Sequence, residues 1–315
     1  MDVSTIVVSY NTAHLLPEMM GKLEAASNGL AVETIIIDNA SSDTSVDLIR
    51  AQFADCTLIV NPSNVGFGRA NNQALPLIRG EFVLLLNTDA FVCPNSLAQT
   101  VAYMRANPKS GILGVKLAGR DGQLQPSARF FPTPWNAFVH RAGLQKYFKG
   151  TGMVDSENWN HQSAMQCDWV PGCYFLIRKT VIDQVGLFDP RYFLYFEEVD
   201  LCFAAKKAGW DVVSFPDVTV VHIGGESAKS DGAITKSGRQ LQALQIESEL
   251  LYFRKNHGAA TVLADVVLSS LADLLCVFKQ FFKTKNQQAM SSYFQHTSLM
   301  WTLFVRTRWG STPTR

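Results

Sequence analysis

The chain has 315 residues, of which 47% are hydrophobic, and its formal net charge is +1. A chain of this length and composition can bury a large core, so intrinsic disorder is not expected. The nearly neutral charge argues against a general nucleic-acid-binding protein, because such proteins carry a marked basic excess. The charge is uneven, however: the segment from Leu274 onward has six basic residues and no acidic one, so it carries +6 and the rest of the chain −5.

Strand and helix patterns alternate along the first third of the chain. Apolar runs predict strands over 5–10, 33–38, 57–61 and 81–87, and the segments after them predict helices over 14–27, 43–53, 68–78 and 94–106. This alternation predicts an α/β fold with a parallel sheet and right-handed crossover connections.

The remainder of the chain is less regular. Residues 119–172 show no sustained periodicity, and because an irregular segment of this length is usually functional, we expect a lid or acceptor loop there. Further strands are predicted over 173–178 and 218–222, and further helices over 180–185 and 197–208.

Polar residues end the predicted parallel strands. The clearest case is the apolar run 82–86, which stops at Asn87 and Asp89. A continuously apolar strand suits burial on both faces in a parallel sheet, and ligands of such sheets bind beyond the carboxyl ends of the strands. The three upstream strands end in the same way, at Asn11, Asp38 and Asn61. The sequence therefore predicts a ligand site along one edge of the sheet.

Asp38 and the residues that follow it, 39–43, are of the types found in nucleotide-binding sites. A carboxylate at the end of a strand can hydrogen-bond a base or a ribose. Capping of the next helix by Ser42 or Asp43 is an equally weighted interpretation.

The glycines at 66 and 68 precede a helix that carries Arg69 and two amides, Asn71 and Asn72. Backbone N–H groups and the guanidinium could hold a phosphate there, although glycines before a helix are also ordinary turn residues.

Asp89 is a hard oxygen ligand that suits Mg²⁺ or Mn²⁺, ions that often bridge one or two carboxylates to substrate phosphates. Asn87 could contact a ribose or act through water, and the alternative for both residues is a turn leading to Pro94. His222 ends a predicted strand and precedes two glycines, so its ring could complete the metal site. A plain hydrogen-bonding role for His222 is equally weighted.

A second acidic cluster, Glu197, Glu198 and Asp200, opens a predicted helix. Acidic residues at a helix amino terminus are stabilised by the helix dipole, which is the simpler interpretation. Glu197 and Asp200 share one helix face, whereas Glu198 points elsewhere and follows four aromatic residues. A carboxylate near such apolar surface can have its proton affinity tuned for general-base catalysis.

The carboxyl-terminal segment is amphipathic in pattern. Over 261–283, Asp265, Ser269, Asp273 and Gln280 mark a polar stripe against a broad apolar face, and the two aspartates argue against a transmembrane span. Eight aromatic residues interleave with the six basic ones, a composition suited to an anionic membrane interface. The alternatives are a contact within a homo-oligomer and a helix packed on the rest of the protein.

Taken together, these motifs resemble the family 2 inverting glycosyltransferases of the GT-A fold, especially the bacterial rhamnosyltransferase-like branch, over residues 3–255. Each motif is modest, but their order along the chain is specific. The motifs are Val7-Val-Ser-Tyr-Asn11, residues 37–43 and 61–72, Leu86-Asn-Thr-Asp89, Trp169-Val-Pro-Gly172, Phe188-Asp189 with residues 196–201, and His222-Ile-Gly-Gly.

The resemblance implies roles for the matched residues. Glu198 would be the catalytic base, with Glu197 as the alternative because the family's Glu-Asp motif reads Glu197-Glu198 here. Asp89 and His222 would bind Mg²⁺ or Mn²⁺. The acceptor would contact Trp169, Gly172 and Asp200, and the donor would contact Ser9, Tyr10, Asn11, Asp38, Asn39, Asn64, Gly66, Arg69, Asn72, Asn87, Thr88 and Asp89.

The resemblance further implies a domain organisation and an activity. A GT-A domain over 1–255, with a mostly parallel Rossmann-like sheet flanked by helices, would precede a helical tail over 256–315. The domain would transfer L-rhamnose from dTDP-rhamnose to a saccharide or lipid-linked saccharide acceptor in cell-surface polysaccharide synthesis.

The expected location is cytoplasmic, peripheral on the inner face of the cytoplasmic membrane. The six cysteines lack C-x-x-C spacing, which indicates reduced thiols, and the amino terminus lacks a secretory signal pattern.

Three other functions compete with this interpretation. A sugar nucleotidyltransferase lacks support, because no Gly-rich Arg/Lys signature follows the first strand. A sugar-nucleotide-binding scaffold at the membrane that has lost turnover is motivated by Asn87 and Glu198, which depart from the family pattern. A glycosidase is disfavoured because it needs no nucleotide-type edge.

Overall fold

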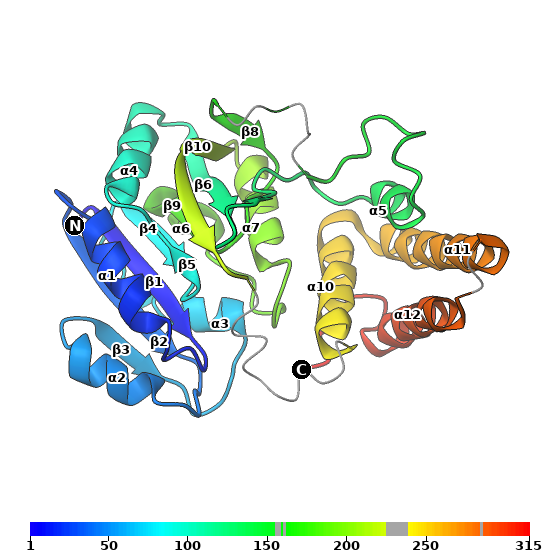
Figure 1. Ribbon diagram of the computed structural model, residues 1–315, viewed down its shortest axis with the longest axis horizontal. Coiled ribbons are helices and arrows are strands. Elements are labelled where there is room, and N and C mark those ends of the chain that lie inside the picture. The colour runs from blue at the N-terminus through cyan, green and yellow to red at the C-terminus, as the bar shows by residue number, and fades with distance from the viewer. Residues whose placement is uncertain (155–158, 160–161, 225–238, 284–285) are drawn as a thin grey trace. The chain divides into compact units, whose positions relative to one another are not determined.

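The computed structural model describes residues 1–154, 159, 162–224, 239–283 and 286–315. The chain divides into two compact units, whose elements are labelled in Figure 1. The first, which we call the sheet unit, comprises Met1–Arg129, Val154–Phe193 and Glu197–Gly238. The second, which we call the helical unit, comprises Phe130–Met153, Leu194–Phe196 and Arg239–Arg315.

Within its described residues, the sheet unit has ten strands in one mixed sheet. Eight follow the order β3-β2-β1-β4-β9-β6-β10-β5, while β7 pairs with β6 and β8 pairs with β10. β1 (Val3–Ser9), β2 (Val32–Asp38), β3 (Thr57–Val60) and β4 (Phe82–Leu86) are parallel, as predicted. β9 (Tyr174–Arg178) runs antiparallel between β4 and β6 (Ser110–Ala118), and β10 (Asp211–His222) is parallel to β6. The short strands are β5 (Ala90–Phe91), β7 (Leu124–Gln125) and β8 (Met165–Cys167).

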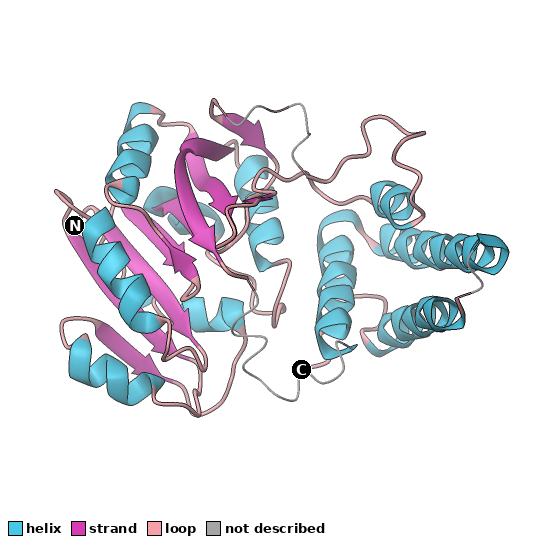
Figure 2. Cartoon of the chain, viewed as in Figure 1, coloured by secondary structure: helices cyan, strands magenta, loops and turns pink. Residues whose placement is uncertain are grey.

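Helices flank this sheet, which confirms the predicted α/β class (Figure 2). They are α1 (Leu16–Ala26), α2 (Ser45–Gln52), α3 (Phe67–Asn72), α4 (Ser96–Ala106), α6 (Lys179–Val185) and α7 (Glu197–Lys207). The helix predicted over 68–78 is shorter than expected. α3 ends at Asn72, and a separate 3₁₀ turn, η1 (Leu75–Leu77), contains Pro76, which cannot continue an α-helix because it lacks a backbone N–H.

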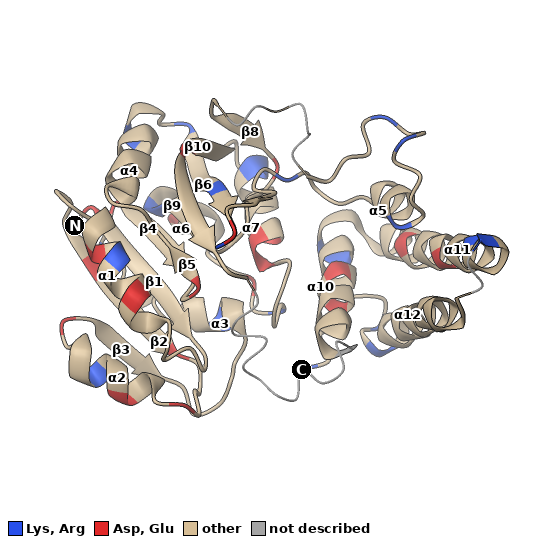
Figure 3. Ribbon diagram, in the orientation of Figure 1, with Lys and Arg blue, Asp and Glu red and all other residues tan. Residues whose placement is uncertain are grey.

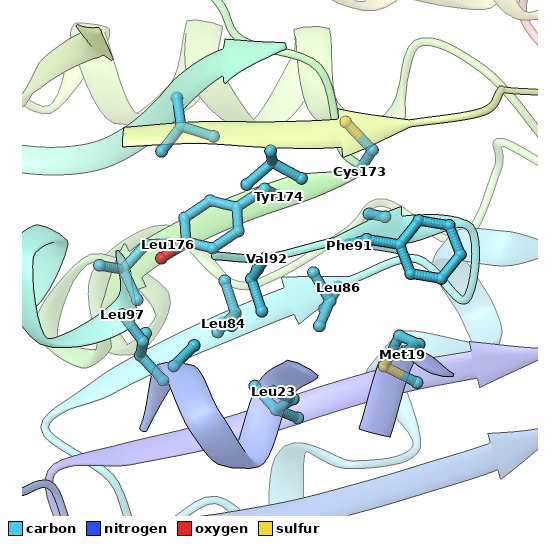
Figure 4. Close-up of a cluster of buried hydrophobic side chains, with 14 of the residues drawn as sticks. Met19, Leu23, Leu84, Leu86, Phe91, Val92, Leu97, Cys173, Tyr174 and Leu176 are labelled. Carbon is cyan, nitrogen blue, oxygen red and sulfur yellow. The ribbon is translucent and has the colours of Figure 1, made fainter. Parts of the chain in front are cut away.

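The core of the sheet unit lies between α1, α4 and the strands. Figure 4 shows Met19 and Leu23 of α1 in the same buried cluster as Leu84 of β4. All five residues of β4 are buried, as its apolar run predicted, and each such side chain contributes about 1.5–3 kcal/mol relative to exposure. The buried Tyr174 hydroxyl hydrogen-bonds to Thr100 Oγ1 (2.7 Å), so this polar group is not left unpaired.

β6 is a central strand that the sequence patterns did not predict. Gly111 and Gly114 weaken its strand pattern, yet both are required by close packing. A Cβ at Gly111 would lie 2.7 Å from the Cβ of Trp210, and a Cβ at Gly114 would lie 2.6 Å from the Cβ of Val170. β10 is likewise longer than the predicted 218–222, because the register shifts within 215–219 and interrupts its alternation.

The segment 119–172, predicted to be irregular, contains the short elements β7, α5 (Pro134–Arg141) and β8. Thr133 caps α5 by accepting a hydrogen bond from the Asn136 N–H at 3.1 Å, and Pro134 follows at the first helical position. Elements of this length escape detection by periodicity. Phe130–Met153 belongs to the helical unit, so the segment is divided between the two units.

The helical unit contains α5, α10 (Arg239–His257), α11 (Ala259–Lys283) and α12 (Gln287–Arg306) among its described residues. α10 and α11 meet at Gly258, whose φ of 89° lies in the region that favours glycine. α10 buries Leu250 and Phe253 and packs on α11 and α12. α10 therefore belongs to the helical unit, which includes Arg239–Arg315, whereas the tail expected from the sequence begins at residue 256.

Candidate active site

The carboxyl ends of β1, β2 and β3 lie side by side. The Asn39 N–H donates to the Ser9 carbonyl and the Asn61 N–H donates to the Asp38 carbonyl, each at 2.8 Å. β4 pairs with the other side of β1 and leads directly into Asn87, which is half-buried. Four strands therefore present polar residues at one edge, as the sequence predicted.

Asp38 is fully buried at this edge. Its Oδ1 accepts a hydrogen bond from the Ser41 N–H (2.9 Å), whereas its Oδ2 has no hydrogen-bond partner among the described residues. An unpaired buried acceptor costs about 1–3 kcal/mol, so such atoms in native proteins usually have a water or ligand as partner. Asp38 is oriented to accept one more donor. Ser9, also buried, and Tyr10, half-buried, lie at the end of the neighbouring strand.

Asn11 connects the loops that follow β1 and β2. Its Oδ1 accepts hydrogen bonds from the backbone N–H groups of Ser42 (2.7 Å) and Asp43 (3.3 Å), and its own N–H donates to Ser41 Oγ (2.9 Å). Its φ of 54° is a conformation that asparagine tolerates better than most residues. Through these hydrogen bonds Asn11 stabilises the loop beside Asp38.

Three asparagine amides hold the loop after β3. The Asn39 Nδ2 donates to Asn64 Oδ1 (2.9 Å), and the Asn61 Nδ2 donates to Asn39 Oδ1 (3.1 Å). Asn64 Oδ1 also accepts from the Gly66 N–H (2.9 Å). Asn39 and Asn64, both predicted donor-binding residues, therefore support the loop from within.

Gly66, Arg69 and Asn72 contact the segment that precedes α7. A Cβ at Gly66 would lie 2.5 Å from the Phe193 carbonyl oxygen, so this position requires glycine. Arg69 Nε donates to the Pro190 carbonyl (2.7 Å), and the Asn72 amide both donates to and accepts from the backbone of Phe188. These predicted donor-binding residues therefore connect α3 to the loop 188–193.

Asp89 and His222 are brought together by strand pairing. β5, immediately after Asp89, pairs antiparallel with the end of β10, and His222 lies opposite Ala90. Asp89 is buried, its Oδ2 accepts from the Gly224 N–H (3.1 Å), and its Oδ1 lies 3.6 Å from His222 Nε2. Two residues predicted as metal ligands, 133 positions apart in the sequence, are therefore neighbours.

Gln125 determines which nitrogen of His222 faces Asp89 with a lone pair. The Gln125 Nε2 donates to the His222 carbonyl (2.9 Å), which leaves Gln125 Oε1 to accept from His222 Nδ1–H (3.1 Å). Burial lowers the pKa of His222; the Asp89 carboxylate opposes this shift, and the positive charge of Arg129 adds to it. The neutral imidazole with a proton on Nδ1 then presents an unprotonated Nε2 to the carboxylate.

This geometry fits a cation. A carboxylate oxygen and an imidazole lone pair that face each other without a proton between them are both electron donors, and a divalent metal ion satisfies both. No cluster of three or more His, Cys, Asp or Glu ligands occurs among the described residues. The protein would thus contribute two ligands, leaving the other positions for water and a substrate's phosphate oxygens.

α7 presents the predicted base near its amino terminus. Glu198 is half-buried, whereas Glu197 and Asp200 are buried, and Asp200 is close enough to Tyr192 for its charge to raise the pKa of that phenol beyond the effect of burial. Desolvation raises the pKa of Glu198, an effect that its own backbone N–H and the positive charge of Arg129 oppose.

The backbone just before α7 is strained. Tyr195 and Phe196 have φ values of 72° and 67°, so two consecutive non-glycine residues adopt the left-handed conformation. Such strain persists only where the surrounding structure enforces it, and it concentrates at functional sites.

The charge of Arg129 affects both the candidate base, Glu198, and the candidate metal ligand, His222. Its guanidinium lies over the Trp169 ring, 4.8 Å from the centroid, and its backbone pairs with that of Trp169. Its charge acts on both Glu198 and His222, which places both groups within electrostatic range of one cation. Gly172, at the other end of the Trp169 motif, is half-buried beside the Phe67 ring.

The model of the family "Glycosyl transferase family 2" matches residues 4–185, more than half of the chain. The chain belongs to this family. It is therefore a glycosyltransferase, as the motifs implied, and the matched region contains the strand ends, Asp38, Asp89 and Trp169.

Two known proteins illustrate what this glycosyltransferase is similar to. It is 27% identical to the N-acetylglucosaminyl-diphospho-decaprenol L-rhamnosyltransferase of Mycobacterium tuberculosis over 241 residues, which cover 72% of this chain and 78% of that one. It is 23% identical to the rhamnosyltransferase WbbL of Escherichia coli over 228 residues, covering 70% of this chain and 83% of that one.

Solved structures show the same fold. The mannosyltransferase PcManGT from Pyrobaculum calidifontis, in complex with GDP-Man and Mn²⁺, matches with a TM-score of 0.54 at 14% identity, over 98% of this chain and 87% of that one. TarS residues 1–349 from Staphylococcus aureus, in complex with UDP, matches with a TM-score of 0.51 at 16% identity, over 98% and 92%. The predicted GT-A fold is confirmed.

The sequence patterns did not single out two residues of the candidate site, Gln125, which hydrogen-bonds to His222, and Arg129, which stacks on Trp169. Both lie in 119–129, where no periodicity marks an element. Gln125 is placed by the pairing of β7 with β6, and Arg129 by an isolated bridge to Trp169. The one hint in the sequence is that several polar residues occur close together in 119–129.

Proposed function

We propose that this glycosyltransferase moves L-rhamnose from dTDP-rhamnose, with inversion at the anomeric carbon, to a saccharide or lipid-linked saccharide acceptor in cell-surface polysaccharide synthesis. The Mycobacterium tuberculosis relative is named for L-rhamnosyl transfer to a diphospho-decaprenol-linked sugar, and WbbL is named a rhamnosyltransferase. These names support the donor and the acceptor class. The observation that carries the proposal is that Asp89 and His222 face each other just beyond the carboxyl end of β4, with Oδ1 3.6 Å from Nε2.

We assign the donor's base to Asp38. The imide N–H of thymine is a single donor, and the unpartnered, buried Oδ2 of Asp38 is a single acceptor. Ser9 and Tyr10 would line the same end of β1, while Asn11, Asn39 and Asn64 hold the loops around the base through the hydrogen bonds described above.

A divalent cation held by Asp89 and His222 would supply positive charge to the departing diphosphate. The Mn²⁺ and GDP-Man bound to PcManGT support this assignment. The imidazole ligand favours Mn²⁺ over Mg²⁺, which prefers oxygen. Because Asn87 replaces one carboxylate, Asn87 and the buried Thr88 would contact the donor rather than the cation.

Glu198 is proposed to take the proton from the acceptor hydroxyl. Desolvation raises the pKa of Glu198, which makes the carboxylate a stronger base than an exposed glutamate, and the positive charge of Arg129 opposes this rise. Glu197 is buried in the first turn of the same helix and is the weaker candidate.

The acceptor is proposed to lie against Trp169. Arg129 stacks on this ring, and its guanidinium is suited to a phosphate of the donor or of a lipid-linked acceptor. Asp200 is buried within range of Tyr192, so we give it a supporting role for the start of α7, and Gly172 keeps the backbone beside Trp169 free of a side chain.

The test is release of dTDP from dTDP-rhamnose with and without acceptor. We expect metal-dependent release that falls by about 10²–10⁴-fold in Glu198→Gln, since general-base catalysis has this worth, while thermal stabilisation by the donor is retained. Glu197→Gln is the matched variant. Tight donor binding without release by the wild type would support a non-catalytic scaffold, and full activity in Glu198→Gln would reject the base.

The tail is proposed to hold the enzyme at the inner face of the cytoplasmic membrane. From Leu274 onward, aromatic residues alternate with basic residues and no acid is present. Electrostatic attraction to anionic lipids would then bring the active site to a lipid-linked acceptor.

A further inference from the structure

A helix on the surface of a water-soluble protein usually exposes its polar residues. Helix α11 instead buries its polar residues and exposes apolar ones. Its polar residues are inside: Asp265, Ser269 and Asp273 are 0%, 6% and 1% exposed. Val262 and Val266 are buried beside them, but the residues on the outer face are apolar too: Leu271 and Phe278 are 44% and 62% exposed. The amphipathic pattern of the sequence is present, but the polar stripe faces the interior of the helical unit.

The buried aspartate Asp273 explains why this face is inside. Its Oδ1 accepts from Arg141 of α5 (2.6 Å), and its Oδ2 accepts from His296 and Thr297 of α12, each at 2.8 Å. α11 packs on α5 and α12 along this side. Because Asp273 is fully paired, turning the helix over would break a charged network, so the inverted orientation is specified by the sequence.

The opposite face is apolar without interruption. Between 260 and 278, every α11 residue in the exposed class is Ala, Val, Leu or Phe. The large ones recur every three or four residues and form one stripe about 22 Å long at 1.5 Å per residue. We call them the α11 stripe: Leu263, Val267, Leu271, Leu274 and Phe278. Single exposed apolar residues are ordinary, but a continuous stripe of this length marks an interaction surface.

The carboxyl end of the stripe is aromatic and basic. Phe281 and Phe282 are more than half exposed, and Lys279 and Lys283 lie among them. Figure 3 shows this basic end of α11, with the acidic residues of the helix confined to its earlier part. α12 has no acidic residue, and it exposes Phe294, Trp301, Val305 and Arg306.

We propose that α11 lies in the plane of an anionic bilayer with its stripe inserted among the lipid acyl chains. The exposed Lys283 at its end complements anionic headgroups, whereas the Lys279 ammonium donates to the Ala142 carbonyl. The phenylalanines fill the layer between headgroup and chain. By length and composition, α11 is the one helix in the described residues that could cross a membrane. The packing of its other face on α5 and α12 instead favours an orientation along the surface.

A second copy of the chain fits this face less well. In two copies in contact along α11, Lys283 would find no acidic partner on the facing helix, because Asp265 and Asp273 lie on its buried side. Anionic lipid provides both the apolar layer and the negative charge.

The inference deepens the membrane part of the proposed function and does not depend on catalysis. Insertion predicts a contact that persists in salt, because apolar burial is not screened, whereas adsorption by the basic tail alone is lost once the Debye length falls to about 3 Å at 1 M salt.

The test is flotation of the full-length protein with vesicles containing phosphatidylglycerol, at 0.1 M and 1 M NaCl, without substrates. We expect binding at both concentrations and at least a tenfold loss in Val267→Asp/Leu271→Asp. Leu77→Asp, at an exposed leucine of the sheet unit, is the matched control and should float like the wild type. Release of dTDP from dTDP-rhamnose should be unchanged in both variants, which separates failure of this inference from failure of the catalytic proposal.

Insertion depth gives a second readout. In a Cys56→Ser/Cys93→Ser background, a fluorophore on Leu274→Cys should be quenched by spin labels on the acyl chains and not by a water-soluble quencher. Complete loss of wild-type binding in 1 M NaCl would show adsorption only and overturn the inference. So would a wild-type dimer in solution that becomes monomeric in Val267→Asp/Leu271→Asp and never binds vesicles.

Discussion

β4 of the sheet unit buries only apolar residues, whereas α11 of the helical unit buries its polar residues as well. In the sheet unit, β4 is wholly apolar and buried, and polar residues such as Asp89 appear where the strand ends. In the helical unit, α11 buries Asp265 and Asp273 and exposes leucine and phenylalanine. The amphipathic pattern of α11 therefore shows that the helix has two faces. Its contacts with neighbouring helices decide which of the two faces is buried.

The largest effect is expected from a substitution at the polar edge of the sheet unit. We expect Asp89→Ala to lower sugar transfer by about 10³-fold or more, because the developing charge on the leaving group loses its electrostatic support. Asp47→Ala, at an exposed position of α2, is the control and should retain activity. Initial rates with saturating Mn²⁺ measure both, and circular dichroism checks the fold. Normal turnover in Asp89→Ala would remove the metal assignment.

Truncating one leucine in each unit tests the difference in burial directly. Leu84→Ala, in β4, is expected to lower the free energy of unfolding by about 2–5 kcal/mol through a cavity in the core. Leu271→Ala, in the α11 stripe, should change it by less than about 0.5 kcal/mol in the absence of lipid. Urea denaturation of both variants measures this. Equal costs would mean that the α11 stripe is covered in solution.

Two carboxylates of the helical unit, Glu249 and Asp265, predict that the free energy of unfolding depends on pH. Desolvation raises the pKa of Glu249 to about 7, although Arg141 opposes the shift, and burial together with the charge of Glu249 raises that of Asp265.

Because the folded state holds the Glu249 proton more tightly than the unfolded state, its stabilising contribution is complete below pH 4.5 and is lost as the pH rises towards 7. We expect the free energy of unfolding to fall on the order of 2 kcal/mol between pH 5 and 8. Glu249→Gln should remove most of this slope in urea titrations at the two pH values. An unchanged slope in that variant would contradict the assignment.

The smallest expected effect concerns Arg129. Transfer should rise with pH as Glu198 loses its proton, and Arg129→Gln should move this rise to higher pH, because the positive charge that opposes the raised pKa of Glu198 is removed. The measurement is kcat/KM between pH 5 and 9, with Arg120→Gln as control. A rise that stays in place would mean that Arg129 does not act on the base.

The sequence predicted the parallel half of the sheet because short apolar runs alternate there with helical patterns, and it predicted the Asp89–His222 pair through motif resemblance. It did not predict β6, where Gly111 and Gly114 accommodate close packing at the expense of a strand pattern. Neither could it predict Gln125, whose role depends on a hydrogen bond to His222 from 97 positions away. Periodicity is local information, whereas these features depend on contacts between distant segments.

The same limit applies to α11. The sequence showed its polar stripe correctly but not that Arg141 of α5 and His296 of α12 would meet that stripe and bury it. The partners of a helix are set by tertiary packing, and a single sequence does not record them.

The most direct test of the proposed active site is the position of Mn²⁺ in crystals of the enzyme grown with Mn²⁺ and dTDP, located by anomalous scattering. We expect one peak bonded to Asp89 Oδ1 and His222 Nε2, with diphosphate oxygens on its open side. A peak bonded to neither residue, in a crystal that contains dTDP, would contradict the site.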